Sequence, residues 1–262
     1  RKRFKITNRV FAYPYVLFMV LFVILPLVMI LVNAFLDDGG NLTVENFKTF
    51  FTEESSLIIL GNSLFVGVVT TAICLLIGYP VAYKLSRMSS GKILVLFFLL
   101  PIGVNFLIRT LAAKAIFIAL DVTLGMGTVL FGMVYNDLPF MILPLHTSLS
   151  SIDKSYIEAA QDLGADRSTV FLKTVLPLSV GGIMSGITMV FIPTISTFAI
   201  SQLLSNGKIF VFGDSIQTKF DQGLYGVGSI MSLVMLAFVL ISNFLMNRIN
   251  KNNNVGVGRS LW

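Results

Sequence analysis

Long stretches without charge constrain this chain more than any other feature. Four of them contain no charged side chain, and they cover residues 10–36, 57–83, 174–207 and 222–247. A helix of about 20 apolar residues crosses a hydrocarbon core of about 30 Å. Each of the four stretches is therefore long enough to span a membrane.

Two further apolar stretches carry isolated charges. Residues 93–120 include Arg109 and Lys114, and residues 122–152 include Asp137. Charges inside a membrane helix usually face a protein interior or a water-filled cavity, so both stretches still count as spans. The prediction is an all-α polytopic membrane protein with six transmembrane helices. We place them near residues 13–36, 58–83, 93–118, 126–148, 176–204 and 224–247.

The composition excludes an ordinary soluble enzyme. Apolar residues make up 55% of the 262 residues and charged residues only 12%, whereas soluble domains carry about 25% charged residues. With Cys74 and His146 as the single members of their types, the sequence offers no usual zinc site or Cys/His nucleophile. It also lacks a GxxxxGK[ST] phosphate loop. We predict a single transmembrane domain over residues 1–262, with no catalytic residue and no metal site.

Basic residues gather on one side of the predicted topology. The segment before residue 10 contains five of them, and the segments 84–92, 154–173 and 248–259 contain three each. Because Lys and Arg are enriched in cytoplasmic loops, both termini and these loops are predicted in the cytoplasm. The net charge of +6 then follows from topology in a lipid bilayer, and it needs no nucleic acid as a partner.

One of these cytoplasmic loops, residues 149–177, is long and has helical character. Ser155 followed by Glu158 is a capping-box pattern, which predicts the start of a helix. Gly164 predicts its end at a residue with positive φ, and Asp166 predicts the N-cap of a second helix. Small residues beside Gly164 would let the surface of another protein approach closely.

The spacing within this loop resembles that of a known family. Glu158-Ala159-Ala160 is followed, after three residues, by Gly164 and later by Leu176-Pro177. This resembles the EAA loop of ABC importer permeases, whose pattern is EAA-x3-G-x9-I-x-L-P, with Thr174 in the isoleucine position. The resemblance implies the type I, MetI-like permease fold. It also implies that these residues insert into a groove on an ATP-hydrolysing subunit.

Three further segments resemble spermidine/putrescine permeases of the PotB type. With them, the resemblance covers nearly the whole chain. They are Leu76–Tyr83, Leu100–Arg109 and Leu138–Leu145. The implied partners are a second permease subunit of the PotC type, a cytoplasmic ATPase dimer that binds ATP and Mg, and an extracytoplasmic polyamine-binding protein. No cofactor is implied for this chain, and its implied location is the bacterial inner (plasma) membrane. The outer connection at 119–128 is shorter than is usual in this family.

A polyamine pathway requires carboxylates, carbonyls and aromatic faces that hold a polycation loosely. Asp137 is the one carboxylate well inside a predicted span, and Tyr135 lies beside it. We regard both as candidates for the substrate pathway. The alternative for Asp137 is a structural ion pair with Arg109 or Lys114.

Three other side chains complete the candidate pathway or gate. Arg109 is expected to have a structural or gating role, unless it extends outward to the lipid headgroups. Phe198 and Gln202 are expected in the outer half of the helix at 176–204, facing the pore. For Phe198, contact with lipid or with the protein core is the alternative.

Together these features predict the permease subunit of an ATP-driven polyamine importer. Such a subunit is not an enzyme, because ATP hydrolysis resides in a partner, and it couples ATPase motion to alternating access. An ABC permease for another solute, such as an inorganic anion or ferric ion, is the first alternative. A secondary transporter is a weaker one, since the sequence shows no inverted repeat between its halves.

Overall fold

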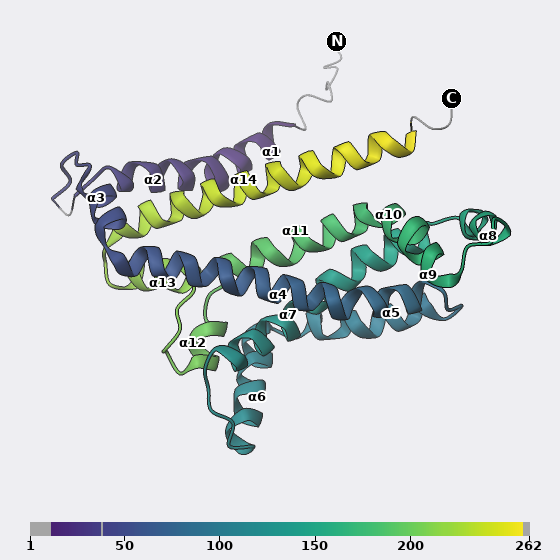
Figure 1. Cartoon of the computed structure of the whole chain (residues 1–262). Helices are drawn as coiled ribbons and strands as arrows, with labels where there is room; N and C mark the ends of the chain where they lie inside the picture. Colours follow the sequence, from purple (N-terminus) through teal and green to yellow (C-terminus); the bar gives the residue numbers. More distant parts are fainter. Residues whose placement is uncertain (1–11, 38, 259–262) are drawn as a thin grey trace, which may run out of the picture. The chain divides into compact units, whose positions relative to one another are not determined.

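The computed structural model describes residues 12–37 and 39–258, and these residues form an all-helical fold (Figure 1). The basic segment 1–11 and Arg259, on which part of the topology prediction depends, lie outside the described residues. Internal contacts divide the chain into two compact units. The described part of the first is 12–57 with 215–236, and that of the second is 58–214 with 237–258.

In the first unit, one asparagine joins two of the helices. Its elements are α1 (Ala12–Met19), a π-helical turn (Val20–Ile24), α2 (Leu25–Ala34), α3 (Glu45–Thr52), most of α13 (Phe212–Asp221) and the start of α14 (Tyr225–Gly258). Asn46 on α3 donates from Nδ2 to the carbonyl oxygen of Leu36 at 2.8 Å and to that of Ala34 at 3.3 Å. These bonds fix α3 against the end of α2. Gly226 on α14 leaves room for Asn46, with which a Cβ would collide.

The second unit contains the remaining helices and nearly all of α4. Its elements are α4 (Glu54–Ser86), α5 (Gly91–Leu99), a 3-10 turn (Leu100–Gly103), α6 (Phe106–Ala119), α7 (Met126–Ser150), α8 (Lys154–Asp162), α9 (Arg167–Val170), a π-helical turn (Phe171–Val175), α10 (Leu176–Leu178), α11 (Val180–Ser196) and α12 (Ile200–Ser205). In Figure 1, α7 and α11 run side by side, and α8 lies at the far end of this unit beyond α9 and α10.

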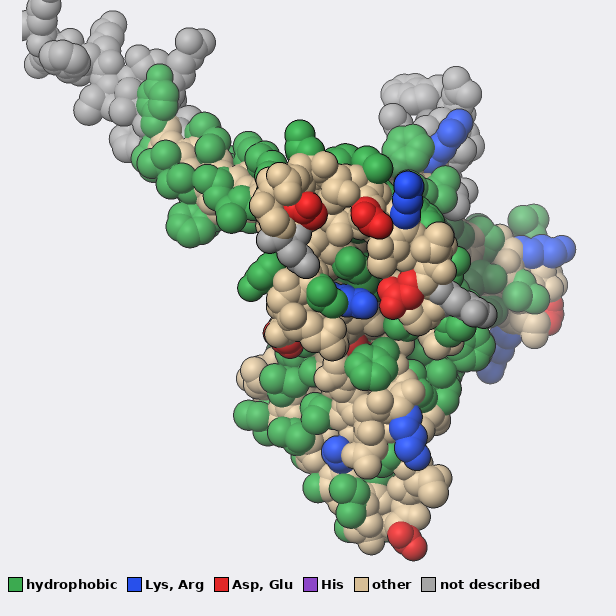
Figure 2. Space-filling view, turned by 90° about the vertical axis from the view of Figure 1, so that its left-hand side faces the viewer, with side chains coloured by type: hydrophobic (Ala, Val, Ile, Leu, Met, Phe, Trp, Pro, Cys, Tyr) green, Lys and Arg blue, Asp and Glu red, His purple; other side chains and the backbone are tan. Residues whose placement is uncertain are grey.

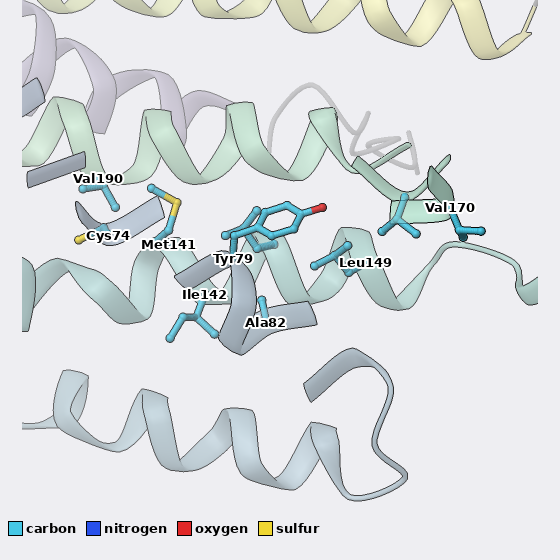
Figure 3. Packing of buried hydrophobic residues seen from close by; sticks show 10 residues of the cluster. Cys74, Tyr79, Ala82, Met141, Ile142, Leu149, Val170 and Val190 are labelled. Carbon is cyan, nitrogen blue, oxygen red and sulfur yellow. The ribbon is translucent and has the colours of Figure 1, made fainter. Parts of the chain in front are cut away.

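A cluster of buried apolar side chains, most of them from α4, α7 and α11 and two from α9 and the π-helical turn after it, forms the core of the second unit (Figure 3). Its buried members are Cys74, Tyr79, Ala82, Met141, Ile142, Leu145, Leu149, Val170, Val175 and Val190. Gly186 lets α7 and α11 approach, because a Cβ at this position would lie only 2.6 Å from the Sδ of Met141. Close approach through small residues is typical of packed membrane helices.

The predicted number of spans is confirmed. Within the described residues, four helices are long and apolar enough to cross a membrane, and counting each of two bent helix pairs as one span gives six. The four are Tyr13–Ala34, Ser55–Ser86, Met126–Ser150 and Tyr225–Arg248. Large apolar side chains such as Leu76 and Phe97 are exposed. Figure 2, which views the molecule from the left-hand side of Figure 1, shows hydrophobic side chains in green with charged ones in red and blue between them. Exposure of this kind suits a lipid environment.

The third predicted span, 93–118, is broken and not continuous. Its halves, Ile93–Gly103 and Phe106–Ala119, meet at an angle of 89°. Pro101 has no amide proton to continue the helix, and Asn105 caps α6 by accepting a hydrogen bond from the amide of Leu107 at 2.8 Å. An average of hydrophobicity over the segment does not detect such a break.

The fifth predicted span, 176–204, is wrong at its outer end. α11 ends at Ser196, and a connection at 197–199 leads into the separate helix α12. Ala199 has a φ of 71°, and its amide donates to Asp214 Oδ1 at 2.7 Å. Phe198 therefore lies in the connection and Gln202 on α12, so neither is in the outer half of a long helix. A second bend, of 62°, separates Arg167–Leu178 from Val180–Ser196.

Candidate functional site

The loop at 149–177, called the EAA loop below, is organised by caps that its own residues provide. Asp153 accepts a hydrogen bond from the amide of Ser155 at 2.9 Å, so α8 begins at Lys154. The predicted capping box at Ser155 is thus wrong, because the better acceptor lies two residues earlier. Asp166 accepts from the amide of Thr169 at 3.3 Å, and this second predicted N-cap is confirmed. The hydrogen bond from the backbone amide of Ser155 is the main cause that lowers the pKa of Asp153. For Asp166, the main cause of a lowered pKa is the side-chain hydrogen bond with Thr169.

The turn after α8 presents an apolar side chain to the outside. Gly164 has a φ of 81°, which confirms the predicted helix end with positive φ. Leu163 beside it is 90% exposed. Glu158 and Ala159 are also exposed, whereas Ala160 packs against the core cluster. The small and apolar side chains of α8 and its turn are therefore divided between an inner face at Ala160 and an outer face at Ala159 and Leu163.

The far end of the EAA loop is attached to α4. Ser179, at the bend before α11, is fully buried and shares a 2.8 Å hydrogen bond with the hydroxyl of Tyr79. Phe171 packs edge-on against Tyr79 and Tyr83, with ring centroids 5.8 and 5.4 Å apart. Leu176 packs against the core cluster, and Pro177 is exposed at the start of α10. A displacement of the loop would thus be transmitted directly to α4 and α11.

A second candidate region is a cavity of about 530 Å³ where α6, α7 and α11 meet. Arg109, Asp137 and Phe198, three of the predicted pathway residues, line it together. The breaks in the third and fifth spans make this possible, because their irregular segments contribute to the wall. Tyr135 lines a neighbouring cavity of about 260 Å³, and Gln202 is not among the residues that line either.

Asp137 is bound to a residue that the sequence reasoning missed. The hydroxyl of Thr194 on α11 donates to Asp137 Oδ2 at 2.9 Å. Among the described residues, no nitrogen of Arg109 or Lys114 lies within the 4.0 Å of an ion pair with Asp137. Lys114 donates instead to Asn206 Oδ1 at 3.3 Å. Nothing in the sequence near Asp137 indicates Thr194, because 57 residues separate the two.

Arg109 is buried and faces two cavities. Its side chain is 9% exposed, which excludes the alternative that it extends to lipid headgroups. The guanidinium carbon lies 5.7 Å from the ring centroid of Tyr135, within the range of a cation–π contact. Its Nε and Nη1 have no hydrogen-bond partner among the described residues.

The segment that follows α11 is fixed by one buried acid. Asp214 accepts hydrogen bonds from the hydroxyl of Ser201, from the amide of Ala199 and from the amide of Val211. Burial raises the pKa of Asp214, and these hydrogen bonds oppose the shift. Through the amide of Ala199 the acid anchors the segment next to Phe198, which lines the cavity.

Comparison with known proteins identifies the family. A family model described as "Binding-protein-dependent transport system inner membrane component" matches residues 1–255. The chain belongs to this family. This permease is therefore a multi-pass membrane protein, and the membrane reading of its apolar stretches is confirmed.

Individual relatives agree with this assignment. The spermidine/putrescine transport system permease protein PotB of Haemophilus influenzae is 32% identical to this permease over 259 residues, which cover 89% of this chain and 90% of that protein. A bacterial alginate ABC transporter, solved in complex with an alginate pentasaccharide-bound periplasmic protein, matches with a TM-score of 0.66 at 17% identity, over 93% of this chain and 94% of that one. The inward-facing MetNI methionine ABC transporter matches with a TM-score of 0.60 at 18% identity, over 76% and 98%. The predicted MetI-like permease fold is thus confirmed.

Proposed function

We propose that this permease is the transmembrane subunit of an ATP-driven importer for the polyamines spermidine and putrescine. The observation that carries the proposal is the 32% identity to a spermidine/putrescine permease over 89% of the chain. The chain hydrolyses no ATP itself and acts as one permease domain over residues 1–262.

The proposed partners follow from the family and from the fold. They are a second permease of the PotC type, a cytoplasmic ATPase dimer with ATP and Mg, and an extracytoplasmic polyamine-binding protein. The family's dependence on a binding protein supports the last of these, and the alginate relative was solved with its periplasmic protein. Both termini and the EAA loop face the cytoplasm of a bacterial cell, with the chain in the inner membrane.

The EAA loop is the proposed contact with the ATPase. Leu163, which is 90% exposed, fills an apolar pocket of the ATPase, and Glu158 makes polar contacts around it. Motion of the ATPase moves α8 and reaches Phe171, which packs on Tyr79 and Tyr83. The hydrogen bond between Tyr79 and Ser179 then carries the displacement to the bend before α11.

Substitution of Leu163 tests this contact. Burial of a leucine side chain contributes about 1.5–3 kcal/mol, so Leu163→Ser should weaken ATPase association by about tenfold or more. Leu120→Ser is the matched control, because Leu120 follows the C-terminal end of α6 as Leu163 follows that of α8. Leu120 is 68% exposed and lies outside the EAA loop. The measurement is the amount of ATPase that co-purifies with the membrane-inserted permease. Equal recovery with both variants would contradict the coupling role.

Uptake by the reconstituted importer tests the substrate class. Proteoliposomes that contain the permease, its partners and the binding protein should accumulate labelled spermidine or putrescine only when ATP is supplied. Labelled phosphate and ferric ion serve as the competing solutes. ATP-dependent uptake of either of these without polyamine uptake would favour the alternative substrates and reject the polyamine proposal.

A further inference from the structure

The cavity between α6, α7 and α11 contains a buried acceptor without a partner. Asn136 is 3% exposed and lines the cavity. Its Nδ2 donates to the carbonyl of Gly132 at 2.8 Å, so the donor end of the amide is satisfied within α7. The Oδ1 has no hydrogen-bond partner among the described residues. Buried polar atoms in proteins are nearly always paired, so this oxygen is open to a donor group, just as the Nε and Nη1 of Arg109 in the same wall, likewise unpaired within that part of the chain, are open to an acceptor.

Asp137 adds a negative charge to the same wall. Thr194 is 1% exposed, and its hydroxyl fixes Oδ2 of Asp137 at 2.9 Å. Within the described residues this is the one hydrogen bond that the carboxylate accepts. An ionised carboxylate has about four acceptor positions, so most of its capacity remains available. A positioned carboxylate beside an unpaired carbonyl is a set of ligands that suits an ammonium group.

Aromatic rings line the same cavity. Phe106 and Phe198 contact each other edge to face, with ring centroids 6.3 Å apart. The face of an aromatic ring attracts a cation through its quadrupole. These rings can therefore cover the methylene groups next to an ammonium as well as the cation itself.

Arg109 limits how strongly this cavity attracts a cation. It lines both cavities, and its charge acts on Asp137 through space without an ion-pair contact. Its guanidinium carbon also lies 5.7 Å from the ring centroid of Tyr135. The acid therefore keeps free acceptor positions while its charge is partly balanced from a distance.

We propose that this cavity is a subsite for one primary ammonium group of the substrate, bound by the carboxylate of Asp137 and the carbonyl of Asn136. Arg109, held against Tyr135, keeps the affinity low enough for the substrate to leave. A transport pathway requires such a balance, because a site that binds too tightly stops transport. The inference rests on the proposed function, since it assigns a place to the polyamine.

Equilibrium dialysis of radiolabelled spermidine against the purified permease–ATPase complex tests the subsite. Asp137→Asn should raise the dissociation constant about tenfold or more, because a charge-assisted hydrogen bond is lost. Arg109→Gln should lower it by about fivefold, because a like charge is removed. Asp121→Asn is the matched control for the acid. Asp121 is exposed outside the cavity, and asparagine tolerates its φ of 56°.

The decisive result is that Asp137→Asn and Arg109→Gln change the dissociation constant for spermidine in opposite directions. A merely structural role for both residues would weaken binding in both variants, and so would a zwitterionic ligand that pairs with both charges. Either outcome overturns the subsite. Should the Asp137→Asn complex fail to assemble, Thr194→Val retains the carboxylate and removes only its positioning hydroxyl. This variant should weaken spermidine binding about threefold, by loss of one hydrogen bond. Unchanged binding, or failure of both variants to assemble, also overturns the proposal.

Uptake by the unaltered importer separates this inference from the proposed function. If proteoliposomes with the unaltered chain accumulate spermidine but Asp137→Asn leaves its binding unchanged, the subsite alone is rejected. If the unaltered importer transports phosphate or ferric ion and no polyamine, the proposed function is rejected and the subsite with it.

Discussion

The EAA loop and the cavity satisfy their polar groups in opposite ways. In the loop, Asp153 and Asp166 cap α8 and α9 with bonds to neighbours two and three residues away. In the cavity, Asn136 and Arg109 are buried and keep atoms that find no partner within the described part of the chain. The loop is therefore a finished local structure that a partner can contact from outside. The cavity is stabilised by distant parts of the chain and leaves atoms that a ligand can satisfy.

A backbone clash in the cavity wall gives the largest expected effect and tests whether that wall is rigid. A Cβ at Gly213 would collide with the carbonyl oxygens of Thr197 and Ser196. Gly213→Ala should destabilise the permease by about 3 kcal/mol, because backbone atoms cannot move aside cheaply. Gly127→Ala is the control, since nothing lies within 4 Å of its Cβ position. Thermal unfolding in detergent provides the measurement, and equal midpoints for the two variants would show that the wall is soft.

A smaller effect is expected at the turn of the EAA loop. No atom lies within 4 Å of a Cβ at Gly164, so only its φ of 81° opposes substitution. Gly164→Val should strain the turn by about 1–2 kcal/mol and reduce ATP-driven uptake while membrane insertion persists. Gly164→Asn should retain most uptake, because asparagine adopts positive φ more readily. Full uptake with valine would remove the loop from the coupling mechanism.

The smallest effect is expected from the cap of α8. Asp153→Ala removes the acceptor for the amide of Ser155, so amide hydrogen exchange in the first turn of α8 should accelerate. Asp153→Asn is the control, because asparagine also caps helices. The backbone hydrogen bond from Ser155 lowers the pKa of Asp153 below 3.8. The cap thus contributes fully above this pH and weakens as the pH falls through the lowered pKa. Exchange that is equal in the alanine and asparagine variants would show that α8 does not depend on its cap.

The sequence predicted the loop better than the cavity, and the reason is the range of the interactions. The ends of α8 depend on Gly164 and on nearby caps, which leave a local signal even though the cap at Asp153 was misplaced by two residues. The cavity depends on Thr194 reaching Asp137 across 57 positions and on Asp214 reaching Ala199. Such pairings leave no local trace.

The same limit explains the two misjudged spans. Hydrophobicity alone extends the fifth span through Phe198 to residue 204, because the segment beyond Ser196 is mostly apolar and carries no charge. The structure ends the helix at Ser196, where Asp214 binds the amide of Ala199. Six spans could be counted from composition, but their breaks could not.

The 89° bend in the third span leaves only a short helix on each side of the break. α6 has 14 residues, and at a rise of about 1.5 Å per residue it covers about 21 Å, less than the hydrocarbon core of about 30 Å. Backbone groups at the bend cannot be satisfied by lipid, so they must face protein or water. Where water meets these groups, the low-dielectric layer along this line is shorter than in the surrounding bilayer. A transmembrane voltage then falls over that shorter distance.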